Sequence, residues 1–216
     1  MKPKLLTCML SGLLFAPIPT SSMGGWAVIS VQDLPDFAMP GRSFELVFSV
    51  RQHGVEPLGG LSPTVEFTSG DHRRSVAADA TEEKGMYRAT IEFPRSGDWT
   101  VTINSGFGPS RVTLVPITAI QAAGALPTLP EAERGRRLFV AKGCVTCHTH
   151  AEAPVEKSWN MGPELTGKRY PEEFLKQRLT DPKSVIPEAK MPNLHLKSAE
   201  IVALTAFINA EREAAR

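Results

Sequence analysis

The sequence has few cysteines, almost no excess charge and no long apolar run beyond its first residues. Three cysteines in 216 residues are too few for a disulfide scaffold. The 24 lysines and arginines nearly balance the 23 aspartates and glutamates, which argues against a nucleic-acid-binding protein that acts through a basic surface. No segment after the N-terminal region is long and apolar enough to span a membrane. These absences leave a globular chain with one large domain or two small ones.

The first 22 residues have the order of a secretory signal peptide. Two lysines precede an apolar stretch, residues 5–16, and two prolines then lead into the small polar residues that end at Ser22. The apolar part is too short to span a bilayer comfortably, and an uncleaved anchor is the alternative. We therefore expect a periplasmic or otherwise exported protein. Cleavage near Ser22 would remove Cys8 and leave two cysteines in the mature chain.

Residues 23–116 show the period of half-buried strands, because apolar and polar residues alternate between turns that contain glycine or proline. This pattern predicts an antiparallel β-sandwich of the immunoglobulin type, without its disulfide. The only histidines of this part, His53 and His72, lack the spacing of metal ligands, so we expect surface or turn residues there and assign the sandwich no chemistry. The seven expected strands cover residues 26–32, 43–50, 64–68, 73–78, 87–93, 99–104 and 111–115.

One segment of the sandwich resembles a known family. The strand that begins after Gly85 ends in Phe93-Pro94 and is followed by Gly97-Asp98-Trp99. This order is similar to that of YtkA-like domains, which are immunoglobulin-like modules of exported bacterial proteins. The resemblance covers about residues 26–115 and implies a fold, without an agreed activity.

The second part of the chain has the period of helices. Residues 117–130 are small, uncharged and flanked by prolines, which predicts a linker. A helix is expected to begin at Glu131 and to end at Gly143, and an amphipathic helix is expected over residues 198–213. Residues 131–216 are therefore predicted to form an all-α domain.

The segment Cys144-Val145-Thr146-Cys147-His148 has the form C-x-x-C-H, the covalent attachment site of c-type haem. The spacing suits this chemistry, because two thiols add to the two vinyl groups of the porphyrin and the histidine then lies under the iron. A redox disulfide or half of a zinc site would need a βαβ setting or a second pair of ligands, and neither is visible. We expect one covalently bound haem, held by Cys144, Cys147 and His148.

The second axial ligand of the iron must come from a later segment. Met191, in a loop rich in proline before the last helix, offers a thioether that would raise the reduction potential. Met161 and His195 are the competitors. Trp159 could equally contact the porphyrin or fill a loop, and His150 is expected to be a loop residue.

Residues 131–213 resemble a class I, single-haem cytochrome c domain over their whole length. The resemblance rests on four elements that occur in the order typical of that family. They are Gly135 with Phe139 in the first helix, the loop Gly162-Pro163-Glu164-Leu165-Thr166-Gly167, Met191-Pro192, and Phe207 in the last helix.

The resemblance also implies roles for single residues. Gly135 would let the last helix pack closely, and the carbonyl of Pro163 would accept a hydrogen bond from Nδ1 of His148 and so orient the ring. It favours Met191 as the axial ligand over Met161 and His195.

The expected function is the transfer of single electrons between redox partner proteins. An iron with both axial positions filled has no open site for a substrate, so we expect an electron carrier, or an electron-transfer subunit of a larger oxidoreductase, and not an enzyme in its own right. Two other functions stay open at this point. One is a haem-based sensor or ligand-binding protein, which would need a labile Met191. The other is an assembly or adhesion module in which the sandwich binds the partner.

Overall fold

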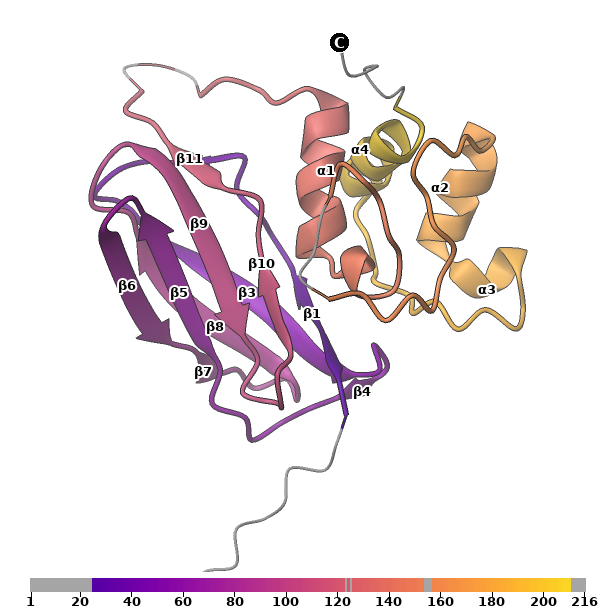
Figure 1. The fold of residues 1–216 in the computed structure, drawn as a ribbon, viewed down its shortest axis with the longest axis horizontal. Helices are drawn as coiled ribbons and strands as arrows, with labels where there is room; N and C mark the ends of the chain where they lie inside the picture. The colour runs from indigo at the N-terminus through magenta and orange to yellow at the C-terminus, as the bar shows by residue number, and fades with distance from the viewer. Residues whose placement is uncertain (1–24, 123, 125, 154–156, 211–216) are drawn as a thin grey trace, which may run out of the picture.

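The computed structural model describes residues 25–122, 124, 126–153 and 157–210, so the predicted signal peptide with Cys8 lies outside the described residues. Figure 1 shows a part made of strands beside a part made of helices, with α1 between the strands and the other helices. The predicted order, an all-β domain followed by an all-α domain, is confirmed. Among the described residues, no helix has both the length and the apolar character needed to cross a bilayer.

The strands form two sheets that face each other. Neighbouring strands are antiparallel except β2 and β11, which run parallel. Each of the seven predicted strands has a counterpart, and the additional ones are only two or three residues long. The first sheet has the order β1 (Ala27–Val31), β3 (Ser43–Gln52), β8 (Met86–Glu92) and β7 (Asp79–Ala80), and β4 (Glu56–Pro57) also pairs with β3. The second sheet has the order β2 (Phe37–Ala38), β11 (Ile117–Ala119), β9 (Gly97–Asn104), β5 (Thr64–Ser69) and β6 (His72–Ala77), and β10 (Arg111–Thr113) also pairs with β9.

Aromatic rings fill the space between the two sheets. Trp99 is fully buried and stacks on Phe93 with ring centroids 5.1 Å apart. Its indole N–H donates a hydrogen bond to the carbonyl of Arg95, and the buried hydroxyl of Tyr87 donates one to the carbonyl of Leu58. Each large apolar side chain buried in this way contributes about 1.5–3 kcal/mol relative to its exposure in water. The alternating apolar and polar residues of the sequence therefore correspond to side chains that point into the sandwich and side chains that point to solvent.

The segment predicted as a linker, residues 117–130, begins with a strand. Ile117 of β11 is fully buried opposite Trp99, and the N–H of Ile120 donates a hydrogen bond to the carbonyl of Ala38. The side chains of Ile117 and Thr118 are β-branched and suit a strand, and β11 fills the position between β9 and β2. The sandwich thus extends beyond its predicted end at residue 116.

The helical part comprises α1 (Glu131–Ala141), a single 3₁₀ turn (Cys144–Thr146), α2 (Glu172–Thr180), α3 (Pro182–Val185) and α4 (Ser198–Ile208). Helices α1 and α4 cross at Gly135, where a Cβ atom would lie 2.0 Å from the carbonyl oxygen of Ala203. Phe139 and Phe207 pack beside this contact, with ring centroids 5.5 Å apart. The glycine is therefore needed for the close approach of the two helices.

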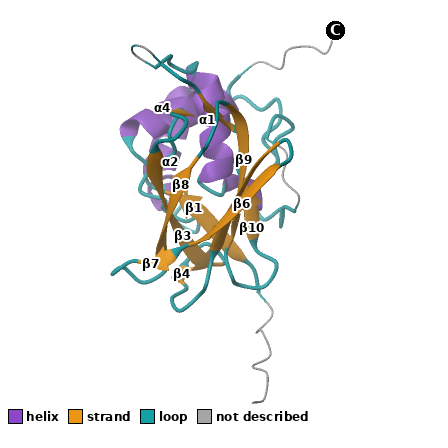
Figure 2. Ribbon diagram, turned by 90° about the vertical axis from the view of Figure 1, so that its left-hand side faces the viewer, coloured by secondary structure: helices purple, strands orange, loops and turns teal. Residues whose placement is uncertain are grey.

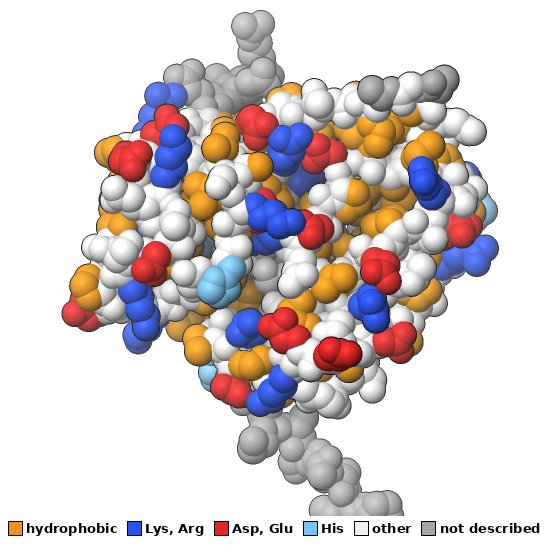
Figure 3. Space-filling view, turned by 180° about the vertical axis from the view of Figure 1, so that it is seen from behind, with side chains coloured by type: hydrophobic (Ala, Val, Ile, Leu, Met, Phe, Trp, Pro, Cys, Tyr) orange, Lys and Arg blue, Asp and Glu red, His pale blue; other side chains and the backbone are white. Residues whose placement is uncertain are grey.

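The two parts share one hydrophobic core. Buried apolar side chains of the strands and of the helices belong to a single contiguous cluster. Figure 2 views the molecule with the strands in front of the helices, against which they pack. On the face shown in Figure 3, acidic and basic side chains are interspersed, with no field of one sign.

Candidate cofactor site

A cavity lies where the helical part meets one end of the sandwich. It contains about 820 Å³ of space, counted with the open solvent at its mouth. All five residues predicted for the site line this cavity: Cys144, Cys147, His148, Pro163 and Met191.

The end of α1 positions the two cysteines and the histidine. Gly143 ends the helix with a φ of 78°, a left-handed conformation that glycine adopts without a steric penalty. The chain then forms the short turn from Cys144 to Thr146, and the N–H of His148 donates a hydrogen bond to the carbonyl of Cys144 at 2.8 Å. The two thiols and the imidazole are thereby held in one compact turn.

A hydrogen bond orients the imidazole of His148. Its Nδ1 lies 2.9 Å from the carbonyl oxygen of Pro163, and because a carbonyl can only accept, Nδ1 carries the hydrogen. Nε2 then keeps its lone pair, which is the form that binds a metal. Burial lowers the pKa of His148; the bond to Pro163 acts in the opposite direction, and the charge of Arg178 adds to the lowering. The ring is therefore neutral at neutral pH.

The loop before Pro163 packs against the same ring. The N–H of Gly162 donates a hydrogen bond to the carbonyl of Cys147 at 2.9 Å. A Cβ atom at Gly162 would lie 2.2 Å from Cε1 of His148 and 2.5 Å from its Nδ1. The imidazole thus rests directly on the backbone of Gly162, and no other residue type fits there without displacing it.

The candidates for the second axial ligand lie in different places. Met191 is half-buried, packs against the core and comes from the loop before α4. Met161 also lines the cavity, but it is 59% exposed and adjoins Gly162, which packs on His148 itself. His195 is exposed and lines a different hollow. A ligand opposite His148 has to come from another segment, which favours Met191.

The thiols are in an environment that keeps them protonated. Burial raises the pKa of the Cys144 thiol to about 12 and also raises that of Cys147. In the described part of the chain, no three His, Cys, Asp or Glu side chains are grouped so that they could hold a metal ion.

The charges around the cavity also fit a haem. Arg178 and Lys190 line it, as does Lys142, whose ammonium group pairs with Glu200, and no acidic residue is among the described residues that line it. A porphyrin with two carboxylates combines an apolar ring with negative charge, which suits a wall of apolar and basic side chains. Two thiols, a neutral imidazole with a free Nε2 and a thioether together supply the donor set that haem c requires.

The comparisons with known families agree with this site. Residues 132–210 match the family Cytochrome c, and residues 29–104 match the family YtkA-like. The C-terminal part is a cytochrome c domain. A YtkA-like domain precedes it, as the sequence resemblance predicted. The coarser functional prediction, a haem-binding protein that transfers electrons, is supported by the same match.

The chain also resembles several solved structures over part of its length, all with TM-scores that carry no functional argument. The first is a Bacteroides vulgatus protein described as a glycoside hydrolase, with 19% identity and a TM-score of 0.34; the match covers 41% of this chain but only 17% of that protein. The ZirS C-terminal domain shares 11% identity over 56% of this chain and 87% of its own length, with a TM-score of 0.36. The Lin-41 filamin domain shares 17% identity over 44% and 93%, with a TM-score of 0.32. None of the curated proteins matches this sequence.

The sequence did not predict that residues of the sandwich line this cavity. Trp26, Val28, His53 and Gly54 line the cavity of the cytochrome c domain, although they lie far from it in the sequence. Trp159 neither lines the cavity nor is buried in a loop, because it is 41% exposed and stacks on Trp26. No local pattern could have found these contacts, since they depend on how the two domains dock.

His150 lies in a loop, as predicted, but its side chain is not on the surface. It is buried, and its ring packs on Phe207 with centroids 4.3 Å apart and on Phe139 at 6.0 Å. Its Nδ1 accepts a hydrogen bond from the N–H of Glu152. It is therefore a core residue of the cytochrome c domain.

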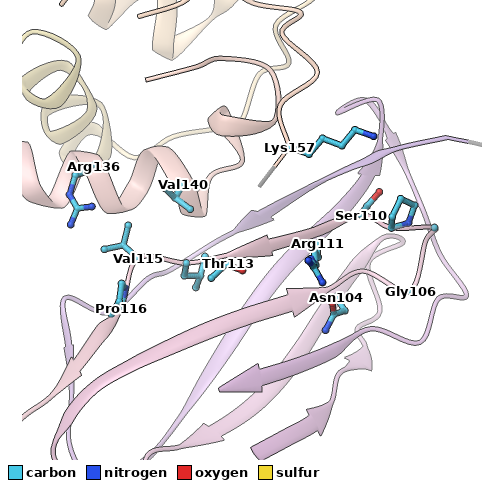
Figure 4. Close-up of a pocket in the computed structure, with 13 residues that line it drawn as sticks. Asn104, Gly106, Ser110, Arg111, Thr113, Val115, Pro116, Arg136, Val140 and Lys157 are labelled. Carbon is cyan, nitrogen blue, oxygen red and sulfur yellow. The ribbon is translucent and has the colours of Figure 1, made fainter. Parts of the chain in front are cut away.

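A larger groove lies between α1 and β10 (Figure 4), with about 1860 Å³ of space that includes open solvent. Val140 and Arg136 face it from α1, and Thr113 and Val115 face it from the sandwich. No thiol, thioether or imidazole is among the described residues that line it, so it does not suit a haem.

Proposed function

We propose that this chain is an exported c-type cytochrome with one covalently bound haem, His/Met ligation of the iron, and a role in passing single electrons between redox partner proteins. The observation that supports it best is the convergence of Cys144, Cys147, His148, Pro163 and Met191 on one cavity. Export is supported by the signal-like order of residues 1–22. In this proposal, residues 131–216 form the haem domain.

Each residue of the site has a separate task. Cys144 and Cys147 would hold the haem through thioether bonds, and the turn between them sets the spacing of the two sulfur atoms. Nε2 of His148 would bind one face of the iron, kept in place by Pro163 and Gly162. When bound, the haem iron supplies a one-electron couple between Fe(III) and Fe(II).

The thioether of Met191 would bind the other face and leave no open position for a substrate. A soft thioether stabilises Fe(II) over Fe(III), so the ligand pair sets a high potential. The residues of this chain therefore bind, orient and tune the haem and break no bond of a substrate, which is the reason to propose a carrier and not an enzyme.

Covalent attachment is tested first. The protein is isolated from a host that matures c-type cytochromes, and haem staining of a denaturing gel is compared for the wild type, Cys144→Ala and Cys147→Ala. We expect staining at the mass of the chain in the wild type and a loss of covalent haem in each variant. A wild-type chain without covalent haem would refute the proposal.

The axial ligand is tested with a matched pair of methionines. Met191→Ala should keep the haem attached, lower the midpoint potential and let carbon monoxide bind rapidly to the reduced protein. Met161→Ala, which alters the same cavity, and His195→Ala should leave both properties unchanged. A fall in potential in either control, with Met191→Ala unchanged, would assign the ligand to that residue. Rapid binding of carbon monoxide by the wild type at full occupancy would favour a haem-based sensor.

A further inference from the structure

The sandwich touches the segment that carries the two cysteines. Gly143, which directly precedes Cys144, lies so close to strand β1 that a Cβ atom there would be 2.5 Å from Cγ1 of Val28 and 2.6 Å from the carbonyl oxygen of Ile29. Any side chain at this position would push the sandwich away from the end of α1. The glycine thus allows β1 to pack directly against the start of the C-x-x-C-H motif.

The sandwich also lies beside the loop that carries Met191. Gly54, in the turn between β3 and β4, lines the same cavity as Pro192, and a Cβ atom added at Gly54 would lie 3.4 Å from Cγ of Pro192. One domain therefore packs against the segment that carries the two cysteines and lies close to the loop of Met191.

Two side chains of the sandwich form the wall between these contacts. Trp26 and His53 both line the cavity, and their rings lie 5.1 Å apart. The N–H of His53 donates a hydrogen bond to the carbonyl of Trp26, and His53 has a positive φ of 53°, a conformation that is uncommon outside glycine. Trp26 also stacks on Trp159 of the cytochrome c domain, with ring centroids 5.6 Å apart, so the wall is in contact with both domains.

A buried polar contact fixes the sandwich in this position. Nζ of Lys142 donates a hydrogen bond to the carbonyl of Gln32, at 2.6 Å, and forms an ion pair with Glu200 at 2.7 Å. The side chains of Lys142 and Glu200 are only 6% and 11% exposed. Separation of the domains would break the hydrogen bond to the carbonyl of Gln32.

The bond from Lys142 is supported along the same side of α1. Asp36 of the sandwich accepts hydrogen bonds from Arg134 at 2.7 Å, and its carbonyl accepts one from Arg137 at 3.0 Å. Lys197, at the start of α4, pairs with Asp33. The wall is thus held by several polar contacts and a shared core, and it does not depend on the linker.

We propose that the β-sandwich is part of the redox centre: Trp26 and His53 are positioning residues that close one side of the haem cavity against water and thereby raise the midpoint potential. This inference rests on the proposed function. Fe(III) carries one more positive charge than Fe(II), so water near the iron favours the oxidised state and its exclusion favours the reduced state. The same wall restricts the access of other ligands to the cavity.

The test uses the full-length protein with its haem attached. Trp26→Ala and His53→Ala open the wall, and Trp26→Phe keeps an aromatic ring in place. Val55→Ala is the control for the turn, because Val55 follows Gly54 but is 64% exposed and does not line the cavity. His72→Ala is the control for histidine, because His72 is exposed, as His53 is, but lies on β6 and not in the cavity wall. The midpoint potential and the rate of carbon monoxide binding to the reduced protein are measured for each variant.

We expect a lower midpoint potential and several-fold faster binding of carbon monoxide for Trp26→Ala and His53→Ala. Trp26→Phe should largely restore both values, and both controls should keep the values of the wild type. Unchanged potential and binding in Trp26→Ala and His53→Ala, or equal changes in the controls, would overturn the inference. If Trp26→Ala does not fold, His53→Ala against His72→Ala gives the same decision. Failure of the proposed function is distinguishable, because the wild type would then carry no covalent haem.

Discussion

Replacement of Gly162 by alanine is the sharpest perturbation of the proposed haem site that leaves its binding residues in place. The new methyl carbon would lie 2.2 Å from Cε1 of His148, whereas ordinary contacts begin at 3.4 Å. Either the imidazole or the loop that carries Pro163 must therefore move by at least about 1 Å. A shift of this size away from Pro163 makes the bond between Nδ1 and the carbonyl of Pro163, now 2.9 Å, too long to count as a hydrogen bond.

The size of the effect follows from the value of that hydrogen bond. A neutral hydrogen bond contributes about 1 kcal/mol net. For a one-electron couple, about 1.4 kcal/mol corresponds to 59 mV, so a bond that stabilised only one oxidation state would shift the potential by about 40 mV, which is the upper limit of the effect. The bond to Pro163 makes the imidazole of His148 more basic, which favours Fe(III). We therefore expect the midpoint potential of Gly162→Ala to rise by tens of millivolts while the haem stays attached.

Spectroelectrochemical titration of the purified protein measures this change. Gly167→Ala is the control, because Gly167 lies in the same loop with a φ of 64° and nothing within 4 Å of a Cβ atom. That substitution strains the backbone by about 1–2 kcal/mol without touching His148. A potential equal to the wild type in Gly162→Ala, or an equal shift in Gly167→Ala, would refute the reasoning from the contact with the ring.

Three further predictions concern stability. Gly135→Ala should lower the free energy of unfolding, measured in denaturant titrations, by at least about 2 kcal/mol. The clash with the backbone of Ala203 outweighs a gain in helix propensity of about 1 kcal/mol. A stabilised variant would contradict the close packing of α1 on α4. Asp36→Ala should cost about 1 kcal/mol at low salt and less at high salt, since it removes a half-exposed ion pair with Arg134. Burial raises the pKa of Glu133, but hydrogen bonds from two arginines outweigh it and lower the pKa below its ordinary value of 4.5. The ionised carboxylate therefore stabilises the folded protein above pH 4.5, and this stabilisation is lost as the pH falls further. Glu133→Gln should therefore be less stable than the wild type at pH 7 and lose less stability on acidification, and parallel pH profiles would contradict this.

Features whose cause is local in the sequence could be predicted. The strand β3 has apolar residues at every second position from Phe44 to Val50, so its period was visible without knowledge of its neighbours. The C-x-x-C-H motif lies within five residues, and its geometry depends on a single turn. The role of Gly135 came from the family resemblance, and the structure supplies its cause, which is the backbone of α4.

Features that depend on contacts between distant segments could not be predicted. Strand β11 was assigned to a linker because three residues carry too little period to indicate a strand, and only pairing with β9 and β2 makes them one. His53 was assigned no chemistry for a similar reason. Its place in the cavity wall depends on the packing of the sandwich against the end of α1, and no spacing in the sequence encodes that arrangement.

Helix α1 explains why the stability of the molecule and the geometry of the site are coupled. Near the start of the helix, Arg134 forms an ion pair with Asp36 of the sandwich, and the next residue, Gly135, allows α4 to pack closely. Just after its end, Gly143 packs on β1 before the chain turns to Cys144. A shift of this helix relative to either neighbour would therefore move the first attachment point of the haem. Since the buried residues of both domains form one cluster, the sandwich and the cytochrome c domain are expected to lose structure together. The sandwich is in that sense a second support of the haem cavity, in addition to the helices that surround it.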